Sequence, residues 1–274
     1  MITGRAVTKR YGDQLVLDAL DFHVERGERV ALLGLNGAGK TTLLRCLLGL
    51  VSFEGELTVD RLSAGAGGAE GKGVRGRIGY VPQQPPRFDL TLTEFVDLFS
   101  RLRGVPAEGP ADFLERLGMP LDRTGRKLLR ELSGGMLQKA LLAMSLGAGV
   151  PVLLLDEPTA SLDASARADF LAALREAPAE STLLFASHRV EDVQALADRV
   201  LLLEEGRLAF DGRVDEMIRR AGALRSAGGA PPGPPGQAPL LLGDILEGVL
   251  RGRLGPRLAA PPRVALAHGA GGAR

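Results

Sequence analysis

The chain has 274 residues, 45% of them apolar and 24% charged, and its 34 basic and 33 acidic side chains leave a formal net charge of +1. The length is typical of one α/β domain with an appendage or of two small domains, and the composition is that of a globular protein and excludes wholesale disorder. The balanced charge gives no electrostatic reason to expect direct nucleic-acid binding, and the single cysteine, Cys46, excludes an internal disulfide framework.

From Met1 to about Arg220, short apolar runs bounded by turn residues alternate with segments of helical spacing. Uninterrupted apolar runs are typical of strands buried on both faces, as in a parallel sheet, and their alternation with helices predicts a layered α/β fold. Strands are expected at Val30–Leu33, Val152–Leu155, Thr182–Ala186 and Val200–Leu203, and helices at Thr41–Leu50, Ala164–Leu174 and Val190–Ala197.

Two internal segments depart from this alternation. Residues 64–73 are rich in Gly and Ala, and we expect a surface loop there to which no function is assigned. Residues 89–130 carry apolar side chains at helical spacing, with Pro106 and Pro110 as breaks and no strand pattern. We expect an inserted helical subdomain, which extends to about residue 145 when the helix predicted at Met136–Leu146 is included.

The composition changes after Arg225, where the predicted main domain, residues 1–225, ends. Ser226–Pro239 holds nine Gly and Pro among 14 residues, which predicts an extended linker. Residues 240–250 have apolar side chains at helical spacing, weakened by interspersed glycines. The segment 240–274 is therefore either a weakly ordered tail or a carrier of one short helix that docks a partner or covers its own domain.

Membrane insertion is not expected from the pattern of apolar residues. The first ten residues lack the apolar core of a secretory signal, and no stretch approaches 18 consecutive apolar residues. We therefore expect a cytoplasmic protein.

The segment GLNGAGKT at residues 34–41 fits the pattern of a phosphate-binding loop, in which glycines precede a lysine and a serine or threonine. Small residues let consecutive backbone N–H groups surround the α- and β-phosphates, and the N-terminus of the following helix adds a favourable potential. The lysine would reach the β- and γ-phosphates and the threonine hydroxyl would ligate Mg²⁺. The predicted nucleotide-binding residues of this segment are Gly34, Asn36, Gly37, Ala38, Gly39, Lys40, Thr41 and Thr42.

Two carboxylates follow the apolar strand at Val152–Leu155. Asp156 ends the strand, where it is suited to hold the Mg²⁺ shell, and Glu157 lies just beyond it, where a carboxylate can orient and deprotonate an attacking water. A carboxylate pair at a strand end is common on protein surfaces, and the phosphate-binding loop is what gives this pair its catalytic interpretation.

The segment LSGGMLQ at residues 132–138 lies 18 residues before Asp156, counted from Gln138. It resembles the LSGGQ-type signature of ATP-binding cassette (ABC) ATPases. Physically, Ser133, Gly134 and Gly135 open a helix and make a second anion-binding N-terminus. One nucleotide does not need two phosphate-binding helix ends in the same chain. The resemblance therefore implies that the signature segment binds the nucleotide of a facing subunit.

The remaining residues singled out by the ABC resemblance occur in the order of the family pattern. It implies that Tyr11 stacks on adenine, that Gln83 contacts Mg²⁺ and leads into the helical subdomain, that Asp163 lies in a loop at the dimer interface, and that His188 hydrogen-bonds the γ-phosphate. Lys139, where Arg is frequent, and Ala164, where Pro is usual, are mild departures. Cys46 is expected to be a small buried residue without redox chemistry.

The resemblance covers about residues 1–220 and implies a P-loop cassette with an N-terminal antiparallel β subdomain, a RecA-like parallel-sheet core and an inserted helical subdomain. It implies Mg²⁺-dependent ATP hydrolysis in a head-to-tail dimer of cassettes. The first functional hypothesis is the ATP-binding subunit of a transporter, held at the inner face of the membrane by a separate transmembrane permease and leaning to an export-type system. The second is a soluble ABC-type ATPase, for example in cofactor assembly.

Overall fold

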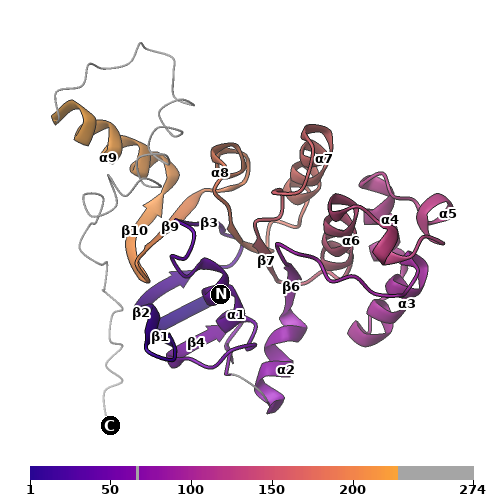
Figure 1. Ribbon diagram of the computed structural model, residues 1–274, viewed down its shortest axis with the longest axis horizontal. Coiled ribbons are helices and arrows are strands. Elements are labelled where there is room, and N and C mark those ends of the chain that lie inside the picture. The colour runs from indigo at the N-terminus through magenta and orange to yellow at the C-terminus, as the bar shows by residue number, and fades with distance from the viewer. Residues whose placement is uncertain (66–67, 228–274) are drawn as a thin grey trace, which may run out of the picture.

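The computed structural model describes residues 1–65 and 68–227, which form two β-sheets flanked by helices (Figure 1). Within these residues no helix is long and apolar enough to cross a membrane. The predicted tail, residues 240–274, lies outside the described residues. Of the predicted linker, residues 226–239, only the first two residues are described, and they form the end of the last helix, α9 (Val214–Ala227). The predicted tail helix therefore stays a prediction.

The smaller sheet is antiparallel and lies near the N-terminus of the chain (Figure 1). Its strands, in the order β2-β1-β4-β5, are β2 (Gln14–Val24), β1 (Ile2–Tyr11), β4 (Glu54–Val59) and β5 (Leu62–Ser63). Every neighbouring pair in it is antiparallel. This sheet is the N-terminal antiparallel β subdomain that the family resemblance implied.

The larger sheet has the strand order β10-β9-β3-β8-β7-β6. All its neighbouring pairs are parallel except the pair of β9 and the edge strand β10. Its strands are β3 (Arg29–Gly34), β6 (Ile78–Val81), β7 (Val152–Asp156), β8 (Thr182–Ala186), β9 (Arg199–Glu204) and β10 (Arg207–Arg213). This arrangement confirms the predicted α/β class, and the apolar runs of β7 and β8 are buried along their whole length.

Alternate residues of the central strands belong to two separate hydrophobic clusters. Leu153 and Leu155 of β7 pack in the cluster that includes residues of α6 (Gly134–Gly147) and α7 (Ala164–Arg175). Leu154, between them, packs in the cluster that includes the small sheet and α1 (Lys40–Leu47). Because successive side chains of a strand point to opposite faces, the large sheet separates these two cores.

Helices gather in the segment between β6 and β7, on the side away from the small sheet (Figure 1). A capping box of Thr91 and Glu94 begins the first of them, and Gly104 ends it in the left-handed conformation. The helices predicted between residues 89 and 145 are present as α3 (Leu92–Arg103), α4 (Glu108–Arg116), α5 (Leu121–Thr124), a 3₁₀ turn (Leu129–Glu131) and α6.

The prediction of a surface loop at residues 64–73 was wrong, because most of this segment lies in the helix α2 (Gly68–Arg77). Its glycines disfavour a helix in isolation. The guanidinium of Arg103 in α3, however, donates to the carbonyl oxygens of Arg75 and Gly76 at 3.0 Å and of Ile78 at 2.6 Å. A residue distant in the sequence thus donates the hydrogen bonds that the carbonyl groups at the end of α2 need. A local sequence pattern does not reveal such a contact.

Candidate functional site

The loop between β3 and α1 has a backbone that only glycine accommodates at two positions. Gly34 has a φ of 151° and Gly39 a φ of 107°. A Cβ on Gly34 would lie 2.4 Å from the carbonyl oxygen of Leu203, and one on Gly39 would lie 2.7 Å from Leu17 Cδ2. The glycines of the predicted phosphate-binding loop therefore allow the loop to pack tightly against its neighbours.

Lys40 is the first residue of α1 and only 7% exposed. Its ammonium group donates hydrogen bonds to the carbonyl oxygens of Gly34 at 2.8 Å and Leu35 at 3.0 Å. Burial lowers the pKa of Lys40, and the carboxylates of Glu157 and Asp156 partly oppose that shift. The lysine charge is thus held inside the loop, close to both predicted catalytic carboxylates.

Asp156 ends β7 and is 2% exposed. Burial raises the pKa of its carboxyl group, and a hydrogen bond with the Thr41 side chain partly counteracts this. Its Oδ1 atom has no hydrogen-bond partner in the part of the chain that the structure describes. An unpaired carboxylate oxygen next to a threonine hydroxyl fits Mg²⁺, which takes oxygen ligands and usually keeps waters and substrate phosphates in its shell.

No cluster of three or more His, Cys, Asp or Glu residues within 1–65 and 68–227 forms a complete metal cage. In nucleotide sites Mg²⁺ is usually bound through one or two protein oxygens together with the substrate phosphates. The donor set at Thr41 and Asp156 thus fits a metal ion that enters with its nucleotide.

Glu157 and His188 contact each other directly. The Glu157 Oε2 atom lies 2.8 Å from His188 Nδ1, and the Glu157 side chain is 11% exposed against 48% for His188. Glu157 has a φ of 47°, and its N–H donates to the carbonyl oxygen of Ala186 at 3.0 Å. The contact brings together a carboxylate that can accept a proton and an imidazole that can orient it.

These groups meet because three parallel strands end side by side. β8 lies between β3 and β7, and its residue Ala186 is paired with Leu32 of β3 on one side and with Asp156 of β7 on the other. Ligands of open α/β sheets bind outside the carboxyl ends of the strands. The predicted residues Lys40, Thr41, Asp156, Glu157 and His188 all follow or end these strands at that edge.

Tyr11 and Gln83 are exposed at the ends of other strands. Tyr11 ends β1 and is 44% exposed, with the ammonium of Lys9 lying 4.7 Å from the centroid of its ring. Gln83 is exposed two residues after β6. Their roles toward adenine and Mg²⁺ remain predictions from the family resemblance.

The predicted signature residues belong to a different part of the molecule. Ser133 is exposed at the N-cap of α6, where its Oγ accepts a hydrogen bond from the Met136 N–H at 3.2 Å. Gly134 and Gly135 are half-buried in the first turn, and α6 packs against α4 and β6, whereas α1 packs against β2, β3, β4 and β7. The signature and the phosphate-binding loop are therefore supported by separate packing contacts.

Asp163 begins α7, and its Oδ1 atom accepts a hydrogen bond from the Ala166 N–H at 2.8 Å. The two residues before it lie against the start of α6, since a Cβ on Gly135 would be 2.8 Å from Leu162 Cδ2 and one on Gly134 would be 3.7 Å from Ser161 Cβ. The structure thus joins the Asp163 loop to the signature segment within the chain.

Sequence reasoning missed Asp192 of α8 (Val190–Leu196), which is 1% exposed. Its carboxylate contacts Thr159, Arg167 and Ser187, which all lie between Glu157 and His188 in the chain. Nothing in the local pattern around Asp192 distinguishes it from the neighbouring Glu191, because its partners are 5 to 33 residues away in the sequence.

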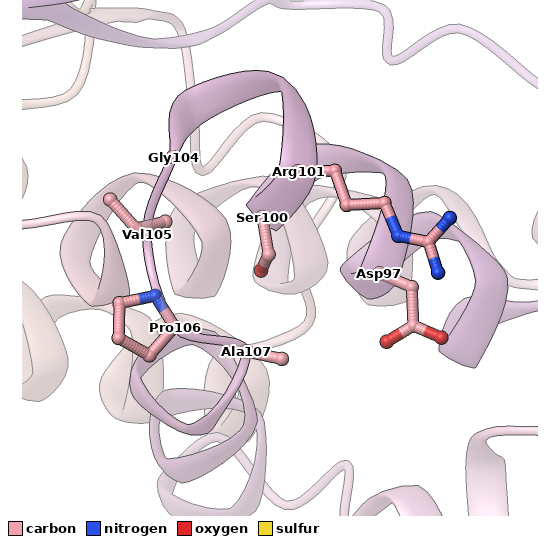
Figure 2. A pocket seen from close by; sticks show the side chains of 7 residues that line it. All are labelled: Asp97, Ser100, Arg101, Gly104, Val105, Pro106 and Ala107. Carbon is pink, nitrogen blue, oxygen red and sulfur yellow. The ribbon is translucent and has the colours of Figure 1, made fainter.

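A hollow of about 480 Å³ lies at the turn between α3 and α4 (Figure 2). The buried hydroxyl of Ser100, which has no hydrogen-bond partner among the described residues, lies there, and Asp97 and Arg101 stand at one side. None of the predicted site residues lines this hollow, so it is separate from the nucleotide site. Its lining residues are Asp97, Ser100, Arg101, Gly104, Val105, Pro106 and Ala107.

Comparisons with known proteins agree with this geometry. The family model described as ABC transporter matches residues 17–160. The Nod factor export ATP-binding protein I of Burkholderia orbicola is 38% identical over 228 residues, which are 78% of this chain and 71% of the relative. A daunorubicin resistance ATP-binding protein of Streptomyces coeruleorubidus is 37% identical over 231 residues, covering 82% of this chain and 72% of the relative.

Solved structures give the same fold. The ATP-binding subunit of an ABC transporter has a TM-score of 0.72 at 25% identity, with 89% of this chain and 99% of that chain covered. A dimeric ATP-binding cassette in a post-hydrolysis state, bound to ADP and Pi, has a TM-score of 0.71 at 24% identity, with 78% and 99% covered. The predicted P-loop cassette fold is therefore confirmed.

Proposed function

We propose that this chain, which belongs to the ABC transporter family and is an ATP-binding ATPase of that family, drives a membrane transporter. The membrane-spanning part of that transporter would be a separate permease chain. The observation that carries the ATP-hydrolysing part of the proposal is the proximity of Lys40, Asp156, Glu157 and His188 at the carboxyl ends of adjacent strands, and the relatives carry the transport part. A cationic loop beside two carboxylates of different burial supports phosphoryl chemistry.

We assign the ATP phosphates to the loop from Gly34 to Thr42, where the backbone N–H groups and the Lys40 ammonium supply hydrogen bonds and positive charge. Thr41, Asp156 and Gln83 would hold Mg²⁺, which when bound neutralises charge on the phosphate oxygens. Tyr11, exposed at the end of β1, would stack on the adenine ring.

Glu157 is the residue that we assign to orient the attacking water and accept its proton. His188 holds the Glu157 carboxylate in place and is also assigned to donate a hydrogen bond to a γ-phosphate oxygen. The Lys40 ammonium stabilises the negative charge that develops on that phosphate. The two functions of His188 make it the residue that links the state of the phosphate to the position of the base.

The separate packing of the signature segment supports a head-to-tail dimer with a second copy of the chain. Ser133 stands exposed at the N-terminus of the 14-residue helix α6, which is a favourable place for an anion. The helix that carries the signature packs against other elements than the helix that follows the phosphate-binding loop. We therefore assign Ser133, Gly134 and Gly135 to the ATP held by the facing subunit, with Asp163 at the same interface.

The names of the relatives favour an exporter. The Burkholderia orbicola relative is a Nod factor export protein and the Streptomyces coeruleorubidus relative is a daunorubicin resistance protein. We propose that this chain serves an export-type system and works at the cytoplasmic face of the membrane through its permease. The transported substrate would be recognised by that permease.

The test is capture of the partner in the ATP-bound state. A tagged Glu157→Gln chain is expected to bind ATP without hydrolysing it, and it should therefore retain a multi-span membrane protein from gently detergent-solubilised cells in the presence of Mg·ATP. A Lys40→Ala chain, in which the phosphate contacts are lost, is the control and should retain less of it. Recovery of Glu157→Gln from the soluble fraction with no membrane protein would contradict the transporter assignment in favour of a soluble ABC-type ATPase.

A further inference from the structure

We propose that Asp192 is a positioning residue that holds Glu157 and His188 in register for hydrolysis. The inference rests on the proposed function, because it assumes that this pair acts on ATP. Asp192 does not touch the pair itself. It contacts the two loops from which the pair projects.

The two oxygens of the Asp192 carboxylate have different partners. Oδ2 accepts hydrogen bonds from the hydroxyls of Thr159 at 2.5 Å and Ser187 at 3.0 Å. Oδ1 accepts from Arg167, at 2.8 Å from Nε and 2.7 Å from Nη2. Both oxygens are therefore engaged, by residues from three separate segments of the chain.

These partners are adjacent to the catalytic pair along the chain. Thr159 is two residues after Glu157, in the loop that follows β7, and Ser187 directly precedes His188, in the loop that follows β8. A single carboxylate oxygen that accepts from both hydroxyls fixes the distance between these loops. The 2.8 Å contact of Glu157 with His188 spans the same two loops.

Burial makes this connection rigid. Asp192, Thr159 and Ser187 are 1%, 2% and 3% exposed, so water cannot replace the hydroxyl contacts. The Arg167 guanidinium, 17% exposed, supplies the positive charge that a buried carboxylate requires. Neutralising Asp192 would leave that cation with the exposed Glu191 carboxylate, at 3.3 Å, in place of a buried one, and an asparagine would replace one acceptor oxygen by a donor.

Arg167 also lies close to the predicted dimer interface. It is in the first turn of α7, whose N-cap residue is Asp163, and its backbone N–H makes the ordinary helical hydrogen bond to the Asp163 carbonyl oxygen. The loop before Asp163 packs against the start of α6, where the signature residues lie. Asp192 is thus linked, through α7, both to the catalytic pair and to the segment of this chain that is assigned to the ATP of the facing subunit.

The first experiment separates hydrolysis from binding in the full-length chain. Asp192→Asn should lower the ATPase kcat by about 10- to 100-fold, because small displacements of catalytic groups cost this much. The KM for ATP and the affinity for a fluorescent ATP analogue should stay within about twofold, because the hydrogen-bond partners of Asp192 are Thr159, Arg167 and Ser187, which lie outside the phosphate-binding loop. Glu191→Gln is the matched control, since Glu191 contacts the same Arg167 at 3.3 Å but is 68% exposed. It should retain the wild-type kcat.

A second pair of variants keeps the test valid if Asp192→Asn folds poorly. Thr159→Val removes the hydroxyl that Asp192 accepts from while keeping the shape of the side chain, and Thr159→Ser keeps the hydroxyl. The valine variant should lose kcat with an unchanged KM, and the serine variant should restore it. A valine variant with a lowered melting temperature but the wild-type kcat would show that the network is merely structural and overturn the inference.

The outcomes distinguish this inference from the proposed function. If the wild-type chain hydrolyses ATP, Glu157→Gln does not, and Asp192→Asn matches the wild type, then the proposed function stands and the positioning role is wrong. If the wild-type chain neither binds nor hydrolyses ATP, the proposed function fails and the role assigned to Asp192 fails with it.

Discussion

Glu157 combines a strained backbone with two restraining contacts. A φ of 47° is uncommon for a residue with a side chain and costs about 1–3 kcal/mol. The hydrogen bond from its N–H to Ala186 and the contact with His188 hold the residue in this conformation. The turn directs the Glu157 carboxylate to His188 while the preceding residue, Asp156, remains buried. Other residues outside the site, such as Ala6 and Glu205, also have a positive φ, so the catalytic assignment of Glu157 rests on its contacts and not on this conformation.

Gly39 and Gly37 provide a matched pair of substitutions in the phosphate-binding loop. Both have positive φ values, 107° and 85°, so alanine at either position carries a backbone cost of about 1–2 kcal/mol. Only at Gly39 would the new Cβ collide, at 2.7 Å from Leu17 Cδ2 and 2.9 Å from the Val16 carbonyl oxygen. We expect Gly39→Ala to lower the free energy of unfolding by about 3 kcal/mol and to abolish ATP binding, and Gly37→Ala to lose about 1 kcal/mol.

Urea unfolding and equilibrium binding of an ATP analogue measure these effects. Equal unfolding midpoints for the two alanine variants would contradict the predicted collision. Retention of tight ATP binding by Gly39→Ala would show that the loop can move away from the small sheet without losing its function.

At the same scale, Cys46 behaves as expected from sequence. Its side chain is fully buried in α1, and burial raises the pKa of the thiol to about 11. A neutral, inaccessible thiol is a poor nucleophile near neutral pH. This agrees with the expectation of a small packing residue.

At the scale of elements, α2 depends on a residue of another helix. Its carbonyl groups at the C-terminal end are hydrogen-bonded by Arg103, whose guanidinium also lies over the Phe99 ring at 5.5 Å. Arg103→Met should therefore lower the free energy of unfolding by about 2 kcal/mol and accelerate amide hydrogen exchange in α2, because it leaves backbone acceptors without a donor. Lysine cannot reproduce the planar fork and should recover only part of the loss.

Chemical denaturation and residue-resolved hydrogen exchange provide the readout. Arg101→Met, on an exposed position of the same helix, is the control and should leave α2 unchanged. Wild-type exchange rates across α2 in Arg103→Met would mean that the helix is stabilised by other contacts.

The elements that sequence predicts well are those with a strong local pattern. The runs at Val152–Leu155 and Thr182–Ala186 are buried strands because each is apolar throughout and bounded by turn residues. The phosphate-binding loop combines a spacing with required residue types, so its position between β3 and α1 follows from the same reasoning. In contrast, α2 and the Asp192 network arise from contacts between distant segments, which the parallel pairing of β7 with β8 and the packing of α3 create.

At the scale of the whole molecule, the proposed dimer predicts complementation between two inactive chains. In a head-to-tail pair each ATP contacts Lys40 of one subunit and Ser133 of the other. Lys40→Ala and Ser133→Arg should each be inactive alone, because every site then contains one defect. When they are mixed, the heterodimer has one site with both defects and one site with none. With random pairing, about a quarter of the wild-type ATPase activity should return.

The matched control combines Lys40→Ala with Glu157→Gln. Lys40 and Glu157 act at the same site of the same chain, as their electrostatic coupling in the structure indicates. Every pairing of these two variants therefore leaves a defect in both sites, and no activity should return. Recovery in this control would place Glu157 across the interface from Lys40. Absence of recovery with Ser133→Arg, at concentrations where Glu157→Gln dimerises with ATP, would instead mean that the signature segment does not complete the site of a second subunit. The exposed N-terminus of α6 would then need another ligand, and the two anion-binding helix ends of this chain would not be parts of one composite site.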